Sequence, residues 1–447
     1  MSPQRPHDPA RRALLRGGGA ALLLRALAVG LPPAWLLAAS APRPARSPLA
    51  LLAARDALAQ SSPRALQTLI LSTSSAGDPV NANCPGAYVP GAQNNPLLAA
   101  SRVTLGAGGA RGASVWGELP EALRARLAFV HLSPRAVAHP EYSATMSLHG
   151  AVKNAAGNGT EMLASALAQL AAPGLGTLQG EPLPLCREPL TYEGQPLQNL
   201  KPSELKALFA GSDPALLDLR ATRDAALGAL YGDLRAQGTR AQRAFLDRYL
   251  LSRDEARSLG ERLGALLGDL STDEDLRDEA GDQVIAAVAL AQLQVSPVVT
   301  IRLPFGGDNH QDRDLTEEQL QTQESVGHLA DLWARLGAAG LRERVSFGLL
   351  NVFGRELQRN SQGGRNHNRA HAVMVAFGAG VRGGVYGGVT GEGQARAINP
   401  ATGAPDGDIP ADETLEAAGH TLALALGHPP EAVASRVRGQ AIRALLA

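Results

Sequence analysis

The sequence from Leu350 to Gly388 reads LNVFGRELQRNSQGGRNHNRAHAVMVAFGAGVRGGVYGG, and this stretch decides the fold. An apolar run at 345–353 overlaps its start and predicts a buried strand, and a second run at 370–377 predicts another. The polar loop between them contains His367. In open α/β sheets, functional side chains lie on loops that follow strand ends. We therefore expect His367 to bind a metal ion or an anion, although a surface histidine without a function fits the spacing equally well.

Two further runs of strand length end in polar loops. LQTLIL (66–71) leads into STSSAGDPVNANCPG, where Ser74 and Ser75 are candidate nucleophiles and Asp78 is a candidate metal ligand. VSPVVTIRL (295–303) leads into PFGGDNHQD, where Asp308 and His310 lie two positions apart in a turn. A carboxylate and an imidazole that converge on one point are suitable ligands for zinc or another divalent ion. An ordinary loop rich in Asx turns explains the first of the two loops equally well.

The rest of the chain supplies the other parts of an α/β domain. A strand at 127–132 precedes a polar loop with His139 and His149, either of which could face the site, and residues 92–112 read as a surface loop. Residues 200–295 predict about three charged amphipathic helices, which would form an insertion or cap. Apolar residues that recur every three or four positions predict helices at 317–341 and 412–426.

The N-terminal segment, residues 1–59, predicts an export signal. Arg11 and Arg12 precede a weakly apolar run at 20–41, as in twin-arginine (Tat) signals. Arg25 and two prolines interrupt the run, which is unlike a membrane-spanning helix. We expect a periplasmic or extracellular protein with one domain at 60–447. Membrane contact is expected only if the signal stays uncleaved as an amphipathic anchor.

Charge and cysteine content restrict the partners. The chain has a net charge of +0, but residues 1–59 hold eight of the 42 basic and two of the 42 acidic side chains, so the remainder has a net charge of −6. A mildly acidic body argues against a nucleic-acid partner. Cys84 and Cys186 could form a disulfide in an exported protein, or they could be two small buried thiols.

Four blocks in this order resemble a large family of exported bacterial proteins of unknown function, related to the alkaline phosphatase and sulfatase superfamily. AGDPVNANCP is similar to the family's GG-x-D-G-L-N-x-x-x-P, GGDNH to GGWDTH, NVFGR to SEFGR, and GGRNH with GVRGGVYG to GGRDHW and its glycine-rich sequel. The resemblance covers 66–427 outside the helical insertion. It implies a mostly parallel central sheet flanked by helices, as in alkaline phosphatase, and metals held by Asp and His ligands.

The resemblance also implies a function and its residues. Asp78, Asp308, His310 and His367 would bind a divalent metal, with zinc as the candidate. A hydroxyl of Ser74 or Ser75 would attack, and Arg355 or Arg365 would bind the anionic oxygens of a phosphate or sulfate ester. Val352 and Asn366 replace two acids of the family pattern, so we expect one metal or none. The alternative is a catalytically degenerate relative that binds an envelope component or assists assembly.

Overall fold

The computed structural model describes residues 65–209 and 214–447. The predicted export signal therefore lies outside the described residues. Within the described ranges, no helix combines the length and the apolar composition needed to cross a bilayer.

A seven-stranded sheet forms the centre of the molecule, with the strand order β13-β4-β12-β9-β1-β8-β5. Its strands are β1 (Thr68–Ser74), β4 (Ala128–Leu132), β5 (Leu183–Pro184), β8 (Val298–Ile301), β9 (Val345–Asn351), β12 (Ala372–Phe377) and β13 (Gly384–Tyr386). The predicted apolar runs all become strands of this sheet. β1 is fully buried along its length and lies between β8 and β9, with Leu71 opposite Thr300 and Gly348.

All neighbouring strands are parallel except at β12, which is antiparallel to both β9 and β4. The mostly parallel α/β sheet expected from the sequence is thus confirmed. Because β1, β4, β8 and β9 run in the same direction, their carboxyl ends lie at one edge of the sheet. The loops that follow these strands carry the candidate residues, so the topology brings those loops to the same edge.

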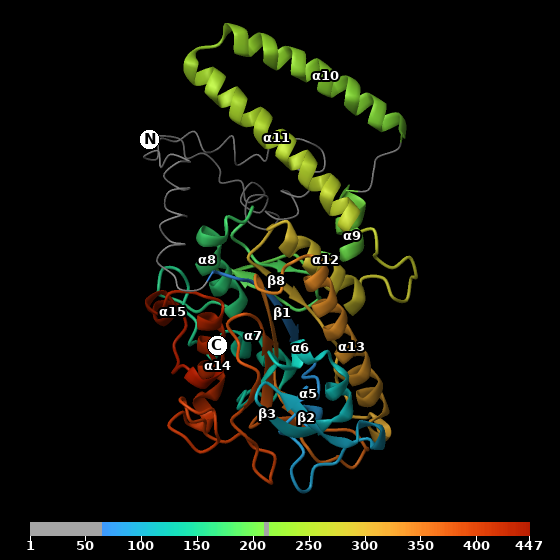
Figure 1. The fold of residues 1–447 in the computed structure, drawn as a ribbon, viewed down its shortest axis with the longest axis vertical. Helices are drawn as coiled ribbons and strands as arrows, with labels where there is room; N and C mark the ends of the chain where they lie inside the picture. Colours follow the sequence, from blue (N-terminus) through green and yellow to red (C-terminus); the bar gives the residue numbers. More distant parts are fainter. Residues whose placement is uncertain (1–64, 210–213) are drawn as a thin grey trace, which may run out of the picture.

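Apolar side chains pack on both faces of the sheet, and helices cover each face (Figure 1). Alternation along β1 places Ile70 in one layer and Leu69 and Leu71 in the other. The first layer is covered by α12 (Ala280–Gln292) and α13 (Thr316–Ala338). The second is covered by α7 (Tyr142–Met146), α8 (Leu163–Leu175), α14 (Thr414–Ala425) and α15 (Pro430–Arg436).

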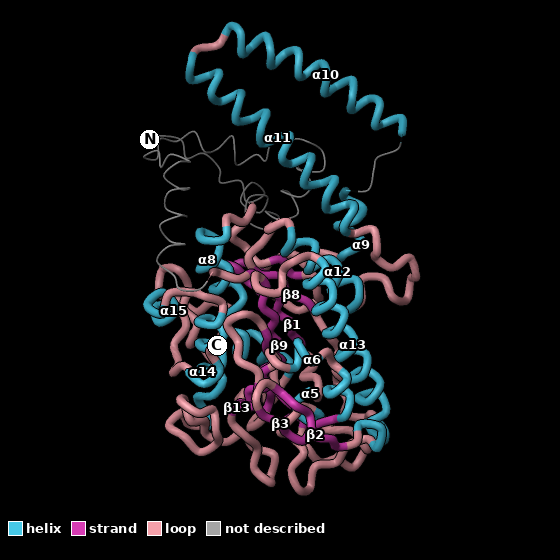
Figure 2. Tube along the Cα trace, in the orientation of Figure 1, coloured by secondary structure: helices cyan, strands magenta, loops and turns pink. Residues whose placement is uncertain are grey.

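The predicted helical insertion divides into two parts. α9 (Pro202–Phe209), α10 (Pro214–Gln237) and α11 (Arg240–Leu266) form an arm, and α10 and α11 extend away from the body (Figures 1 and 2). α12 buries Val284 and Leu290 completely and belongs to the layer that covers the sheet, and Leu205 of α9 and Leu263 of α11 are buried in the same apolar cluster.

The prediction of a surface loop at 92–112 is wrong about the loop from Ala100 onward, although most residues there are at least partly exposed. Residues there form the hairpin of β2 (Ala100–Leu105) and β3 (Gly108–Ala113), with Val103 and Leu105 buried in the core. The glycine-rich composition of β3 hid this strand, because glycine carries no alternation signal. Cys84 and Cys186 are both free and buried, so the described structure contains the two thiols rather than a disulfide between them.

A buried ion pair joins the loops at the carboxyl edge. Arg365 and Glu318 are both 0% exposed and form a bidentate pair, with nitrogen–oxygen distances of 2.7 and 2.9 Å. Glu318 also accepts hydrogen bonds from Asn83, in the four-residue helix α5 (Val80–Asn83), and from Asn309. The Arg365 N–H donates to the Asn309 carbonyl at 3.1 Å. The pair therefore fixes the loop after β8 against the loop that contains His367.

Glu318→Gln should destabilise the fold strongly, because it leaves the buried Arg365 charge uncompensated. Removing one partner of a buried pair typically costs about 3–5 kcal/mol. Urea unfolding followed by circular dichroism should show a much lower midpoint than the wild type. Glu317→Gln, on the same helix but exposed, is the matched control and should cost less than about 1 kcal/mol. Equal midpoints for the two variants would contradict the assignment.

Candidate metal centre

Four side chains from three loops meet at the carboxyl edge of the sheet. Their ligand atoms all lie within 4.8 Å of one another, and the residues are His139, Asp308, His310 and His367. The Nε2 atoms of His310 and His367 are 2.7 Å apart. Asp308 places one carboxylate oxygen 3.5 Å from His139 Nε2 and the other 3.6 Å from His310 Nε2. The prediction that the turn with Asp308 and His310 (the DNH turn, 308–310) meets the loop with His367 (the GRNH loop, 364–367) is thus confirmed.

The local structure explains why each side chain points to this place. His139 follows β4 in a short 3₁₀ turn, η3 (His139–Glu141), and Asp308 and His310 follow β8. His367 begins β11 (His367–Asn368), which pairs with β10 (Gly354–Arg355) just after β9. Gly364 allows its loop to approach, because a Cβ there would lie 2.0 Å from the Asn309 carbonyl oxygen.

Backbone carbonyls orient two of the three imidazoles. His139 Nδ1 lies 2.7 Å from the Ser75 carbonyl oxygen, and His367 Nδ1 lies 2.5 Å from the Val137 carbonyl oxygen. A carbonyl only accepts, so each Nδ1 carries the proton and each Nε2 presents a lone pair to the cluster. This arrangement, a backbone acceptor behind a ligating ring, is common in protein metal sites.

An aromatic ring supports the same two imidazoles. Phe353 is fully buried and stacks on His367 with ring centroids 4.1 Å apart, and it meets His139 edge-on at 5.2 Å. Gly77 makes room for the Phe353 ring, since a Cβ at Gly77 would lie 1.9 Å from it. The ring limits rotation of both histidines and therefore holds their Nε2 atoms in place.

Electrostatics favour the forms that bind cations. Burial lowers the pKa of His310 and of His367, and the Arg355 charge lowers both further, so both rings are neutral near pH 7. Desolvation raises the pKa of Asp308, but the hydrogen bond and charge of Arg355 outweigh it and hold the pKa below its usual value. Three imidazoles and one carboxylate are a donor set that zinc prefers. Two tetrahedral zinc ligands lie about 3.3 Å apart, close to the two distances that join Asp308 to His139 and His310, so the cluster could bind a metal ion.

Arg355 lies behind Asp308 and is completely buried. Its Nη2 donates to Asp308 at 2.8 Å and to the Ala76 carbonyl at 2.6 Å, and its Nε donates to the Gly77 carbonyl at 2.6 Å. Asn81 pairs with the Arg355 backbone in both directions, at 2.8 and 2.9 Å. Arg355 therefore positions Asp308 and is less available to a substrate than we expected.

Other predicted residues lie elsewhere. Arg365 uses all five of its donors on Glu318 and on the carbonyls of Glu356, Leu357 and Gln93, so it is a structural residue rather than an anion ligand. Asp78 is 0% exposed and is not part of the cluster, because it accepts hydrogen bonds from Ser74, Arg302 and the Phe305 N–H. These are corrections to the roles expected from the sequence.

The two candidate serines differ in access. Ser74 is 1% exposed, and its hydroxyl donates to Asp78 at 2.7 Å and accepts from the Ala76 N–H, so it cannot reach a substrate. Ser75 is half-buried, and its hydroxyl has no hydrogen-bond partner among the described residues. Its carbonyl holds His139, which places Ser75 beside the cluster.

The replacement of two acids of the family pattern by Val352 and Asn366 removes no ligand from this cluster. Val352 is completely buried in the apolar layer beneath the sheet. Asn366 is exposed, and its side-chain amide donates to Glu356 and accepts from Asn360. His139 supplies the additional ligand. The sequence offered His139 and His149 as alternatives, and the structure places His149 away from the cluster, bonded to the Pro134 carbonyl.

A second pair of histidines lies deeper in the molecule. His131 and His371 are both 0% exposed, with Nδ1 of the first 2.9 Å from Nε2 of the second. The Pro85 carbonyl must accept from His131 Nε2, so His371 donates to His131 and itself accepts from Asn81. This order of protons satisfies both rings while they are neutral.

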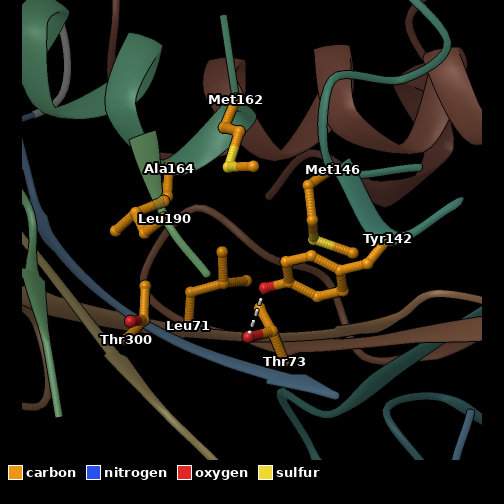
Figure 3. A pocket seen from close by; sticks show the side chains of 8 residues that line it. All are labelled: Leu71, Thr73, Tyr142, Met146, Met162, Ala164, Leu190 and Thr300. Carbon is orange, nitrogen blue, oxygen red and sulfur yellow. Dashed lines mark hydrogen bonds between the residues drawn. The ribbon is translucent and has the colours of Figure 1, made fainter. Parts of the chain in front are cut away.

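A small cavity beneath the sheet is no substitute site. It has a volume of about 10 Å³, roughly room for one water molecule. Tyr142 closes it by donating to Thr73, and two methionines complete its wall (Figure 3). A substrate does not fit in this cavity.

Comparisons with known proteins add no assignment. No protein-family model matches the sequence. No curated protein matches it either.

The amount of bound zinc should depend on the four side chains of the cluster. The full chain refolded or purified with zinc is expected to retain about one equivalent after dialysis, measured by elemental analysis. His367→Ala and His310→Ala should each reduce the affinity by at least tenfold, because each removes a ligand. His328→Ala, on α13 and outside the cluster, is the control and should retain the metal. Retention by all three variants would contradict the assignment.

The free energy of unfolding should decrease as the pH is lowered below 6.5. Burial lowers the pKa of His131 to about 4 and that of His428 to about 4, and lowers that of His371 well below its usual value. The unfolded chain then binds more protons between these pKa values and 6.5, so unfolding becomes easier as pH falls. Each histidine contributes about 1.4 kcal/mol per pH unit in that window. Urea unfolding at pH 7, 6 and 5 checks this, and His428→Leu should reduce the slope by about a third. A flat profile would contradict it.

Proposed function

We propose that the protein is an exported metal-dependent hydrolase that acts on a phosphate or sulfate ester. The observation that carries the proposal is the set of three oriented imidazoles and one carboxylate at the carboxyl edge of a mostly parallel sheet. The alkaline-phosphatase-like fold, the Tat export and the zinc are parts of this proposal. They are supported by the sequence blocks and by the donor set.

Each residue has a role in this proposal. His139, His310, His367 and Asp308 would hold a divalent ion, which would polarise the ester oxygens and lower the pKa of a hydroxyl or water. Ser75 offers the hydroxyl that could attack the ester, because it is the accessible one of the two serines. Arg355 fixes the orientation and charge of Asp308.

A second candidate function follows from the number of ligands. Four protein ligands complete a tetrahedron, which is typical of structural zinc sites, whereas catalytic sites usually keep one position open. On this alternative the cluster stabilises a degenerate relative that binds an envelope component or assists assembly. The proposed hydrolase requires that Asp308 leaves the ion or that a fifth ligand enters.

Turnover of a phosphate or sulfate ester separates the two candidates. The zinc-loaded wild type should hydrolyse 4-nitrophenyl phosphate or sulfate, and Ser75→Ala should lower kcat by at least about 10²-fold while the bound zinc stays at wild-type level. Ser143→Ala, an exposed serine on α7, is the matched control. Zinc bound by the wild type without turnover of either ester would reject the hydrolase and favour the structural alternative.

A further inference from the structure

We infer that Arg302 recognises the charged group of the substrate, and that this group is a dianionic phosphate monoester. The inference rests on the proposed function and names the substrate class for the same site. It starts from a gap in the site described above: Arg355 and Arg365 are both 0% exposed and bonded inward. Neither guanidinium can form the planar pair of hydrogen bonds with which arginine binds phosphate.

Arg302 has the exposure that these two residues lack. It follows β8 directly, and 35% of its side chain is exposed. Its Nη2 lies 3.4 Å from the buried carboxylate of Asp78, which holds one end of the guanidinium. Within the described ranges, neither Nε, which is buried, nor Nη1 has a hydrogen-bond partner, so Nη1 is the unused donor that an entering anion can reach. An anchored guanidinium with unused donors is prepared to bind an anion at little entropic cost.

The position of Arg302 connects it to the metal centre. Arg302 Nη2 would lie only 3.6 Å from a Cβ on Gly307, and Gly307 immediately precedes Asp308. The guanidinium therefore lies beside the backbone that carries the carboxylate ligand. In the described part of the chain, the N–H groups of Gly307 and Asp308 also have no partner. Backbone donors beside a cation commonly complete an anion site.

The charge balance favours a dianion. Asp78 and Asp308 are paired with Arg302 and Arg355, so these four side chains sum to zero. The histidines bind a metal as neutral rings. A divalent ion would leave the centre at about +2, which a phosphate monoester neutralises at neutral pH and a singly charged sulfate monoester does not.

Phosphate binding tests the inference without reference to turnover. Inorganic phosphate is titrated into the zinc-loaded full chain by calorimetry, and Arg302→Ala should weaken its binding by about 10- to 100-fold. Arg302→Lys should lie between the two, because it keeps the charge and loses the planar fork. Arg102→Ala, an exposed arginine on β2, is the matched control and should bind like the wild type. Wild-type affinity in Arg302→Ala, with the zinc content unchanged, would overturn the inference.

Turnover separates the inference from the function on which it rests. Arg302→Ala should lower kcat/KM for 4-nitrophenyl phosphate by at least about tenfold, and should leave that for 4-nitrophenyl acetate, an uncharged ester, unchanged. Equal losses for both esters would show that Arg302 is only structural and would overturn the inference. Arginine-dependent phosphate binding without turnover of any ester would reject the hydrolase and retain Arg302 as an anion ligand.

Discussion

The arrangement of the site depends on the buried ion pair between Arg365 and Glu318. Both side chains are fully buried, and the guanidinium uses all five donors. Glu318 belongs to α13 and also holds Asn309 of the DNH turn, while Arg365 belongs to the loop of His367. Without a partner, either charge would cost several kcal/mol to bury, so the loops can only close together. Arg365, to which the sequence resemblance gives a role in substrate recognition, is therefore one half of the ion pair that clamps the site together.

Once the loops are clamped, the metal centre follows from local bonds. Carbonyls of Ser75 and Val137 fix the imidazoles of His139 and His367, and Phe353 packs against both rings. Arg355 fixes Asp308 from behind, and Asn81 links Arg355 to the buried histidine pair. The cluster is thus preorganised, which is what metal affinity and catalysis both require. The acids missing at Val352 and Asn366 are no loss to this cluster, since neither side chain points to it.

Particular residues show what the sequence could and could not predict. The apolar runs around Ile70, Val299 and Phe347 predicted the strands correctly, because a buried parallel strand is apolar on both faces. The rule that polar loops follow strand ends correctly placed Asp308, His310 and His367 together. It did not separate Arg365 and Asp78, which find buried partners, from side chains that face the site. Those partners include Gln93, 272 residues away, and no local pattern contains them. His139 was within reach of the same rule, because it also follows a strand that ends at this edge.

The central claim is that the clamp creates one metal site from His139, Asp308, His310 and His367. The most direct measurement is an anomalous difference map at the zinc absorption edge, from a crystal of the zinc-loaded protein. The account predicts one strong peak about 2.0–2.2 Å from the three Nε2 atoms and from an Asp308 oxygen. A map without a peak among these four side chains, in a crystal that holds zinc elsewhere, would contradict it.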